Sequence, residues 1–199
     1  MFRTLVALLA ALPLLGLAAP VAEERAANAC TDVIVIFARG TTEPGTIGTI
    51  VGPPLQSALQ SALGSKSLTF TGVPYAADIP GFLVGGDPTG SATMAQLLTS
   101  AASSCPNAKL VTSGYSQGGQ LVHNSAKLIS SSVAARISAA VIFGDPDNGQ
   151  AVQGIPSSKV DVICHVGDNI CQGGAIILPA HLTYGADTPA AASFIAARV

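Results

Sequence analysis

The segment Gly114–Gly118, with the sequence Gly-Tyr-Ser-Gln-Gly, could hold a reactive serine. A short β-branched run, 109–113, precedes it, and apolar residues at helical spacing follow it from 119 to 128. Gly-x-Ser-x-Gly between a strand and a helix is typical of the nucleophile elbow, a strained turn whose glycines have no Cβ to clash with neighbouring backbone. We therefore predict that Ser116 is held at the edge of a sheet, where the helix N-terminus faces a developing oxyanion. The alternative is an ordinary Gly- and Ser-rich loop.

A serine hydroxyl becomes a nucleophile only when a base takes its proton and a carboxylate holds that base. Of the three histidines in the chain, His181 lies in a loop before the last predicted helix and is the best base. In α/β-hydrolases the chain order is Ser, then Asp or Glu, then His, and Ser116, Asp168 and His181 follow it. Asp145 and His165 obey the same order and form a rival pair. We favour Asp168 and His181, since Asp145 also fits an ordinary turn and His165 fits a packed loop side chain.

The oxyanion of a tetrahedral intermediate needs at least two preset hydrogen-bond donors. One is the backbone N–H of Gln117, and the other should come from the loop after the first buried strand, where Thr41 is the candidate. Thr41 could add its hydroxyl, although a plain polar turn residue is the alternative. His123 lies about two turns into the helix behind the elbow and points away from it, so we interpret it as a structural or surface residue.

Strands and helices that would position these residues alternate along the chain. Strands are predicted over 32–37, 67–73, 109–113, 136–143 and 159–164, and helices over 53–63, 91–103, 119–128 and 188–197. After Asp32 the first strand is a continuous apolar run, which is typical of a parallel strand buried on both faces. Ser91 is expected to cap its helix, and 74–90 to form a long functional loop. The pattern predicts an α/β fold with a doubly wound, mostly parallel sheet.

The N-terminus has the features of a secretory signal. Arg3 is followed by an almost wholly apolar run, 5–17, which is shorter than the roughly 20 residues that cross a bilayer. We predict a signal peptide over 1–18, a polar pro-segment over 19–27 and a single domain over 28–199. The chain is therefore expected to be secreted and to have no membrane span.

Charge and cysteine content exclude several classes of protein. The net charge is -2 with only 10% charged residues and no basic stripe, so nucleic acid is not an expected partner. Four cysteines in a secreted chain favour two disulfides with three possible connectivities. Cys164 and Cys171 are close enough to close one loop, which would leave Cys30 for Cys105. Cys-x-x-Cys and His-Glu-x-x-His motifs do not occur, so we expect no metal site and no cofactor.

Several motifs together resemble fungal cutinases over nearly all of the mature chain: Cys30, Arg39–Glu43, Cys105-Pro106, Gly114–Gly118, Cys164–Cys171 and His181–Gly185. The resemblance implies a secreted serine esterase with a small, five-stranded α/β-hydrolase fold. It implies the disulfides Cys30–Cys105 and Cys164–Cys171. It also implies catalysis by Ser116, Asp168 and His181, with an oxyanion hole at Thr41 and Gln117. Family members usually lack a lipase lid and attack insoluble polyesters such as cutin, so we expect the substrate to be an insoluble polyester or a small ester. We also expect a monomer.

Two departures affect the expected substrate and the oxyanion hole. Many cutinases have serine where Thr41 stands, and the turn 143–146 resembles the acetylxylan esterase branch of the family. An acyl chain or hydrophobic polyester is nevertheless favoured by an expected apolar wall of Ile79, Phe82, Leu83, Ile177 and Leu182. For Ile176 and Leu178, packing in the core is an equal alternative. An acetylxylan esterase or a lidless lipase is the alternative activity, and a non-enzymatic surface protein would be indicated by an incomplete triad.

Overall fold

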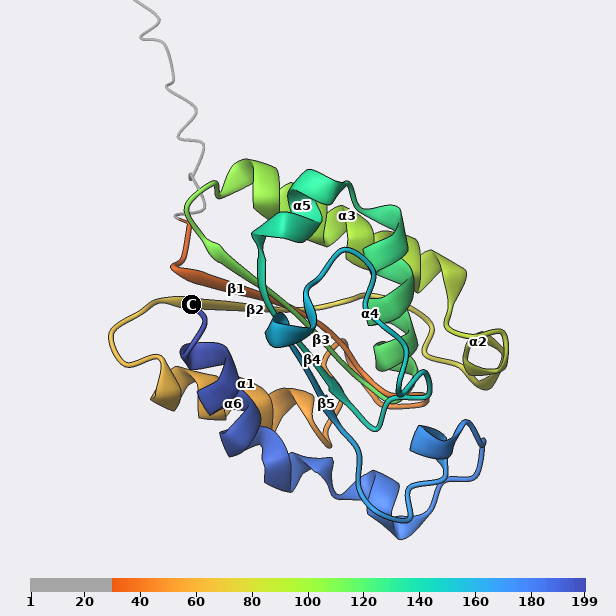
Figure 1. Cartoon of the computed structure of the whole chain (residues 1–199). Helices are drawn as coiled ribbons and strands as arrows, with labels where there is room; N and C mark the ends of the chain where they lie inside the picture. Colours follow the sequence, from red (N-terminus) through yellow and green to blue (C-terminus); the bar gives the residue numbers. More distant parts are fainter. Residues whose placement is uncertain (1–29) are drawn as a thin grey trace, which may run out of the picture.

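The computed structural model describes residues 30–199; the predicted signal peptide and pro-segment lie outside this range. Its sheet has five strands: β1 (Val33–Ala38), β2 (Leu68–Gly72), β3 (Lys109–Tyr115), β4 (Ile137–Phe143) and β5 (Val160–Ile163). Their order is β2-β1-β3-β4-β5, and every neighbouring pair is parallel (Figure 1). The α/β-hydrolase prediction is confirmed. The chain changes direction across the sheet between β1 and β3, and open α/β sheets bind ligands at such a point.

Helices cover both faces of the sheet (Figure 1). They are α1 (Gly52–Ala62), α2 (Ile79–Leu83), α3 (Pro88–Ser104), α4 (Gln117–Leu128), α5 (Ser131–Arg136) and α6 (Thr188–Ala196). Successive residues of β1 point to opposite faces: Val35 packs in the core that contains α1 and α6, and Ile36 in the core with α3 and α4. Four 3-10 turns complete the fold: η1 (Ser157–Lys159), η2 (Ile170–Gln172), η3 (Pro179–Leu182) and η4 (Tyr184–Asp187).

The segment before the elbow strand differs from the prediction. Part of the expected loop 74–90 is the short helix α2, whose first turn is capped by the Asp78 carboxylate accepting the Gly81 N–H. The helix α3 begins at Pro88 instead of Ser91, and Asp87 caps it, so the predicted cap at Ser91 was wrong. Aspartate before proline is a strong helix start, since the proline needs no hydrogen-bond partner for its nitrogen.

Other predicted elements agree with the structure to within a few residues. The unpredicted helix α5 is only 6 residues long, too short to show an apolar periodicity. The strand β5 ends at Ile163, so His165 lies in the following loop. The disulfides are Cys30–Cys105 and Cys164–Cys171, as the resemblance implies. In the range 30–199, no helix is long and apolar enough to cross a membrane.

Candidate active site

Ser116 occupies the turn between β3 and α4, with the unusual backbone angles φ 56° and ψ -123°. This conformation is strained for a residue with a side chain. A Cβ at Gly114 would lie 2.1 Å from the Gly118 carbonyl oxygen, and one at Gly118 would lie 2.0 Å from the Ala38 carbonyl oxygen. The strand, turn and helix therefore approach each other so closely that only glycine fits on either side of the serine. The local conformation is that of a nucleophile elbow.

His181 and Asp168 form a buried pair close to this turn. The Nδ1 atom of His181 lies 2.8 Å from Oδ2 of Asp168, and both side chains are at most 1% exposed. The other oxygen of Asp168 accepts the N–H of Ile170 at 3.0 Å. Burial alone would raise the pKa of Asp168, but hydrogen bonds from His181, Tyr184 and Ile170 outweigh it and lower that pKa. Asp168 is therefore a carboxylate at neutral pH and can stabilise an imidazolium.

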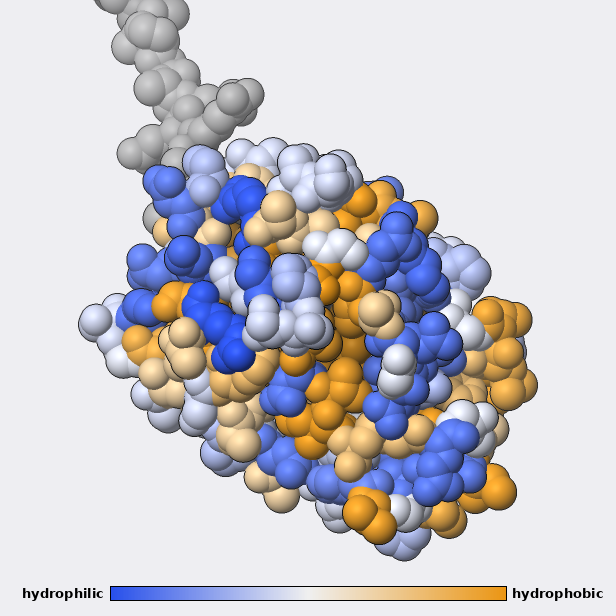
Figure 2. Space-filling model, viewed as in Figure 1, coloured by the Kyte–Doolittle hydropathy of each residue, from blue (hydrophilic) through white to orange (hydrophobic). Residues whose placement is uncertain are grey.

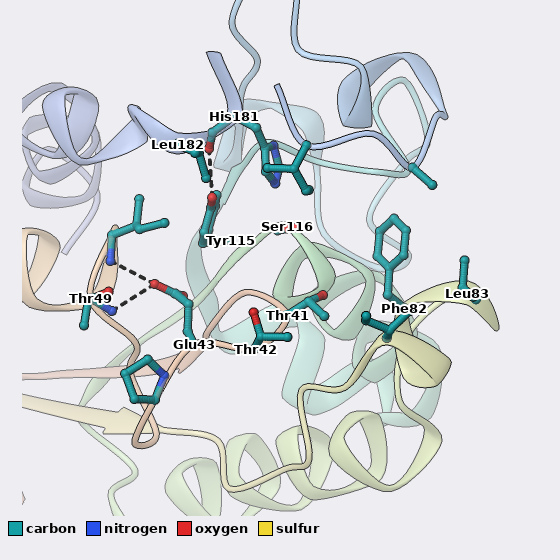
Figure 3. Close-up of a pocket in the computed structure, with 15 residues that line it drawn as sticks. Thr41, Thr42, Glu43, Thr49, Phe82, Leu83, Tyr115, Ser116, His181 and Leu182 are labelled. Carbon is teal, nitrogen blue, oxygen red and sulfur yellow. Dashed lines mark hydrogen bonds between the residues drawn. The ribbon is translucent and has the colours of Figure 1, made fainter. Parts of the chain in front are cut away.

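The remaining ring nitrogen of His181 is available for chemistry. The ring stacks on Tyr115, whose hydroxyl donates to the His181 carbonyl at 2.8 Å. A Cβ at Gly144 would lie 2.9 Å from Nδ1 of His181, so the histidine ring rests directly on this glycine. Within residues 30–199, Nε2 of His181 has no hydrogen-bond partner. Figure 3 shows the ring extending toward Ser116, and both residues line one cavity.

Thr41 and Gln117, the predicted oxyanion residues, are brought together. Because β1 and β3 pair with Ala38 opposite Gly114, the loops that follow the two strands are neighbours. The Gln117 side chain donates to Thr41 Oγ1 at 2.9 Å and to the Asp78 carbonyl at 2.8 Å. Since the Thr41 oxygen accepts this bond, its own proton is free to point into the cavity. The backbone N–H of Gln117 lies in the first turn of α4, where helix N–H groups have no partner within the helix.

Glu43 organises the loop that carries Thr41, and the sequence analysis missed it. Its carboxylate accepts the N–H groups of Gly40 at 2.8 Å and of Thr49 and Ile50 at 2.9 Å each. The last two are the dashed lines to Glu43 in Figure 3. A buried carboxylate with three backbone donors is satisfied without a cation. In the sequence, Glu43 was the last residue of the family motif Arg39–Glu43, and its spacing gave no sign of this role.

A cavity of about 460 Å³ opens over Ser116 and His181. All five side chains of the predicted apolar wall line it: Ile79, Phe82, Leu83, Ile177 and Leu182. Ile176 and Leu178 do not line it and are 65% and 39% exposed, so the alternative that placed them in the core was wrong. Figure 3 shows Phe82 and Leu83 of α2 across from His181 and Leu182.

The rival pair of Asp145 and His165 is not formed. Asp145 is bound to His123 at 3.0 Å, and both side chains are buried, so His123 is structural. His165 is instead 2.7 Å from Asp187. Asp147 lies beside Asp145 and His123. Each of these three side chains offers one atom that could bind a metal ion, and the three atoms lie within 4.8 Å of one another. We assign no metal to this cluster, because the Asp145 oxygens already accept hydrogen bonds from His123 and from the Asp147 N–H.

Comparisons with known proteins identify the family of this chain. The cutinase family model matches residues 29–199. A cutinase of Botryotinia fuckeliana is 66% identical over 92% of this chain and 91% of its own length. A solved Trichoderma reesei cutinase, bound to a C11Y4 phosphonate inhibitor, has a TM-score of 0.81 at 49% identity and covers 83% of this chain and 75% of its own. An acetylxylan esterase structure has a TM-score of 0.68 at 24% identity over 85% of this chain and 99% of its own, a likeness of fold alone. This chain belongs to the cutinase family and is a carboxylic ester hydrolase.

Proposed function

We propose that this chain is a serine esterase that cleaves cutin-like polyesters and short- to medium-chain acyl esters through an acyl-enzyme. The observation that supports this most strongly is the orientation of His181. Its Nδ1 is bound to the Asp168 carboxylate, and its Nε2 has no hydrogen-bond partner among the described residues. Ser116 and His181 line the same cavity. A serine nucleophile, its base and the carboxylate that orients the base are the three groups that acyl transfer requires.

The reaction follows from these positions. Ser116 Oγ attacks the ester carbonyl while Nε2 of His181 takes the serine proton, and the carbonyl oxygen becomes an oxyanion. The oxyanion accepts hydrogen bonds from the Gln117 N–H and from Thr41, each worth about 2.7–4 kcal/mol in the transition state. The alcohol leaves with the proton from His181. Water then attacks the acyl-enzyme by the same route, and the acid is released with Ser116 restored.

The rim of the cavity suits an insoluble, apolar substrate. Ile79 and Leu83 are 58% and 67% exposed on one side, and Ile177 and Leu182 are 53% and 51% exposed on the other. Figure 2 shows apolar surface over α2 at the right-hand edge of the molecule. Exposed apolar patches of this kind mark interaction sites. A polyester chain could therefore lie across the opening and present an ester to Ser116.

The turn 143–146, which resembles acetylxylan esterases, lies where it gives little support to a xylan substrate. Asp145 points to His123 and does not line the cavity. The turn therefore supports the back of α4 and gives no contact by which xylan would be recognised. An apolar cavity wall favours an acyl chain over a polar sugar backbone.

We also propose that the chain is a secreted, monomeric, single-domain enzyme. The predicted signal peptide and the two disulfides support secretion, since disulfides persist mainly in oxidising compartments. A single domain is supported by one five-stranded sheet, to which strands from Val33 to Ile163 contribute. Sedimentation of the mature protein would test the monomer.

A series of p-nitrophenyl esters from acetate to palmitate, with cutin and acetylated xylan beside it, tests the proposed activity. We expect kcat/KM to peak at short to medium acyl chains and cutin to release monomers. Ser116→Ala should abolish both. Wild-type activity in Ser116→Ala would contradict the mechanism, and activity confined to acetate and acetylated xylan would identify an acetylxylan esterase.

A further inference from the structure

Tyr184 contacts the proposed triad from behind. It lies in η4, three residues after His181, and its side chain is fully buried. Its hydroxyl is 2.7 Å from Oδ2 of Asp168, the same oxygen that His181 contacts. In the sequence it was only one letter of a family motif, and the mechanism above does not use it. Its position raises the question of what the hydroxyl does for Asp168.

The direction of this hydrogen bond follows from a second contact. The Tyr184 oxygen also lies 2.8 Å from the backbone nitrogen of His165. A backbone N–H can only donate, so the tyrosine oxygen accepts there and its single proton goes to Asp168. Burial raises the pKa of Tyr184 far above its ordinary value, so the hydroxyl remains a donor at every working pH. Oδ2 of Asp168 thus receives two donors, Tyr184 and His181.

The tyrosine ring has little freedom to move. It stacks on the ring of His165, with centroids 4.1 Å apart and planes at 20°. Its edge meets the rings of His181 and Phe143. A Cβ at Gly144 would lie 2.7 Å from the tyrosine ring, so the turn after β4 also closes on it. The hydroxyl is therefore held at a fixed point relative to Asp168.

We infer that Tyr184 is a positioning residue, whose hydroxyl holds Oδ2 of Asp168 in line with His181 and moderates the negative charge that this oxygen offers to the imidazolium. The inference rests on the proposed triad. Two consequences follow from sharing one oxygen between two donors. Without the hydroxyl, Asp168 keeps its contact with His181 but no longer fixes the angle of that ring relative to Ser116, which lowers kcat. Without it, the carboxylate charge is also less dispersed and favours the imidazolium form of His181 more strongly.

Tyr184→Phe tests this inference, because it removes one oxygen and keeps the ring. We expect kcat for p-nitrophenyl butyrate to fall about tenfold, as for the loss of one hydrogen bond to a charged group. KM should stay near the wild-type value, because the residue does not line the cavity. On the acidic limb of the plot of kcat/KM against pH, the midpoint should rise by roughly half a pH unit. A variant that loses only thermal stability, with kcat and the limb unchanged, would overturn the inference.

Tyr75→Phe is the matched control. The Tyr75 hydroxyl also donates to a protein oxygen, the Arg39 carbonyl, but it does not touch the triad. This variant should lose stability and leave the acidic limb where it is. A shift of the limb as large as that of Tyr184→Phe would show that any lost tyrosine hydroxyl produces it, and would overturn the inference.

Two further variants control for nearby titratable groups and for a Tyr184→Phe protein that does not fold. The titratable side chains around Asp168 and Tyr184 are His181, His165, Asp187 and Tyr115. The limb shift should persist in a His165→Gln background, which removes the other nearby imidazole. If Tyr184→Phe does not fold, 3-fluorotyrosine inserted at 184 keeps the ring and donates more strongly, and should move the limb down. An unchanged limb in the fluorotyrosine protein would contradict the inference.

Ser116→Ala separates this inference from the proposed function. If Ser116→Ala is inactive and Tyr184→Phe behaves like the wild type, only the role of Tyr184 fails. If Ser116→Ala keeps wild-type activity, Asp168 does not belong to a serine triad and both proposals fail. We expect an inactive Ser116→Ala together with a Tyr184→Phe variant of reduced kcat.

Discussion

Two buried histidine–aspartate pairs flank the elbow, and they differ in which ring nitrogen the aspartate holds. His181 meets Asp168 through Nδ1 at 2.8 Å, and His123 meets Asp145 through Nε2 at 3.0 Å. The first pair leaves Nε2 in the cavity with Ser116, whereas His123 does not line that cavity. Burial and pairing are thus common to both. The access of the remaining nitrogen to the serine distinguishes His181, the proposed base, from His123.

Replacing the aspartate of each pair by asparagine should give the largest difference in kcat between the two pairs. Asp168→Asn should lower kcat roughly 10⁴-fold, because an amide can hold the base in the wrong tautomer. Asp145→Asn should leave kcat near the wild-type value and lower the free energy of unfolding by about 3–5 kcal/mol, the usual cost of breaking a buried pair. Steady-state kinetics with p-nitrophenyl butyrate and urea unfolding would measure both. Equal losses of kcat in the two variants would contradict the comparison.

Two glycines with positive φ offer a smaller change at the same site. A Cβ at Gly144 (φ 58°) would meet the rings of His181 and Tyr184, whereas at Gly149 (φ 91°) none of residues 30–199 would lie within 4 Å of it. Gly144→Ala should therefore lower kcat roughly 10²-fold by displacing His181, as misplacements of about 1 Å can do. Gly149→Ala has comparable backbone strain and should affect only stability. Kinetics and thermal unfolding of both would check this, and similar kcat values would count against it.

Two neighbouring isoleucines test whether the cavity binds the acyl chain. Ile177 lines the cavity, and Ile176 is exposed without lining it. Ile177→Ser should lower kcat/KM for p-nitrophenyl hexanoate about tenfold by removing apolar contact with the acyl chain. Ile176→Ser should leave this soluble substrate unaffected. If both variants behave alike, Ile177 does not contact the acyl chain.

The third pair, His165 and Asp187, should contribute to stability in only one pH range. Partial burial lowers the pKa of His165, but hydrogen bonds to the Ala180 carbonyl and to Asp187 outweigh it, so that pKa is raised. A raised pKa stabilises the fold below the unfolded value of about 6.5, and this stabilisation is lost as the pH rises through the folded value. The Tm difference between wild type and His165→Gln should therefore be largest near pH 5 and shrink above pH 7. Asp187→Asn should show the same window, and a difference independent of pH would contradict this assignment.

Local patterns carried most of the fold and the candidate site. The strand β1 is a continuous apolar run, and the strand β3, which enters the elbow, contains the β-branched residues Val111 and Thr112. The chain order of Ser116, Asp168 and His181 can also be read directly from the sequence. Contacts between residues that are several positions apart could not be predicted from the sequence. Glu43 binds backbone groups 6 and 7 residues on, and Tyr184 reaches Asp168 across 16 residues. The cap of α3 was misplaced because Asp87 and Ser91 are both good caps, and the proline between them decides where the helix begins.

The central claim, that Ser116 alone is acylated with the help of His181 and Asp168, is tested most directly by covalent labelling. A p-nitrophenyl alkylphosphonate should release one equivalent of p-nitrophenolate per chain as Ser116 Oγ displaces it from phosphorus. Peptide mass spectrometry should then find the label on Ser116. Asp145→Asn should react at the wild-type rate, Asp168→Asn far more slowly and Ser116→Ala not at all. A label on another residue, or normal labelling of Ser116→Ala, would contradict the account.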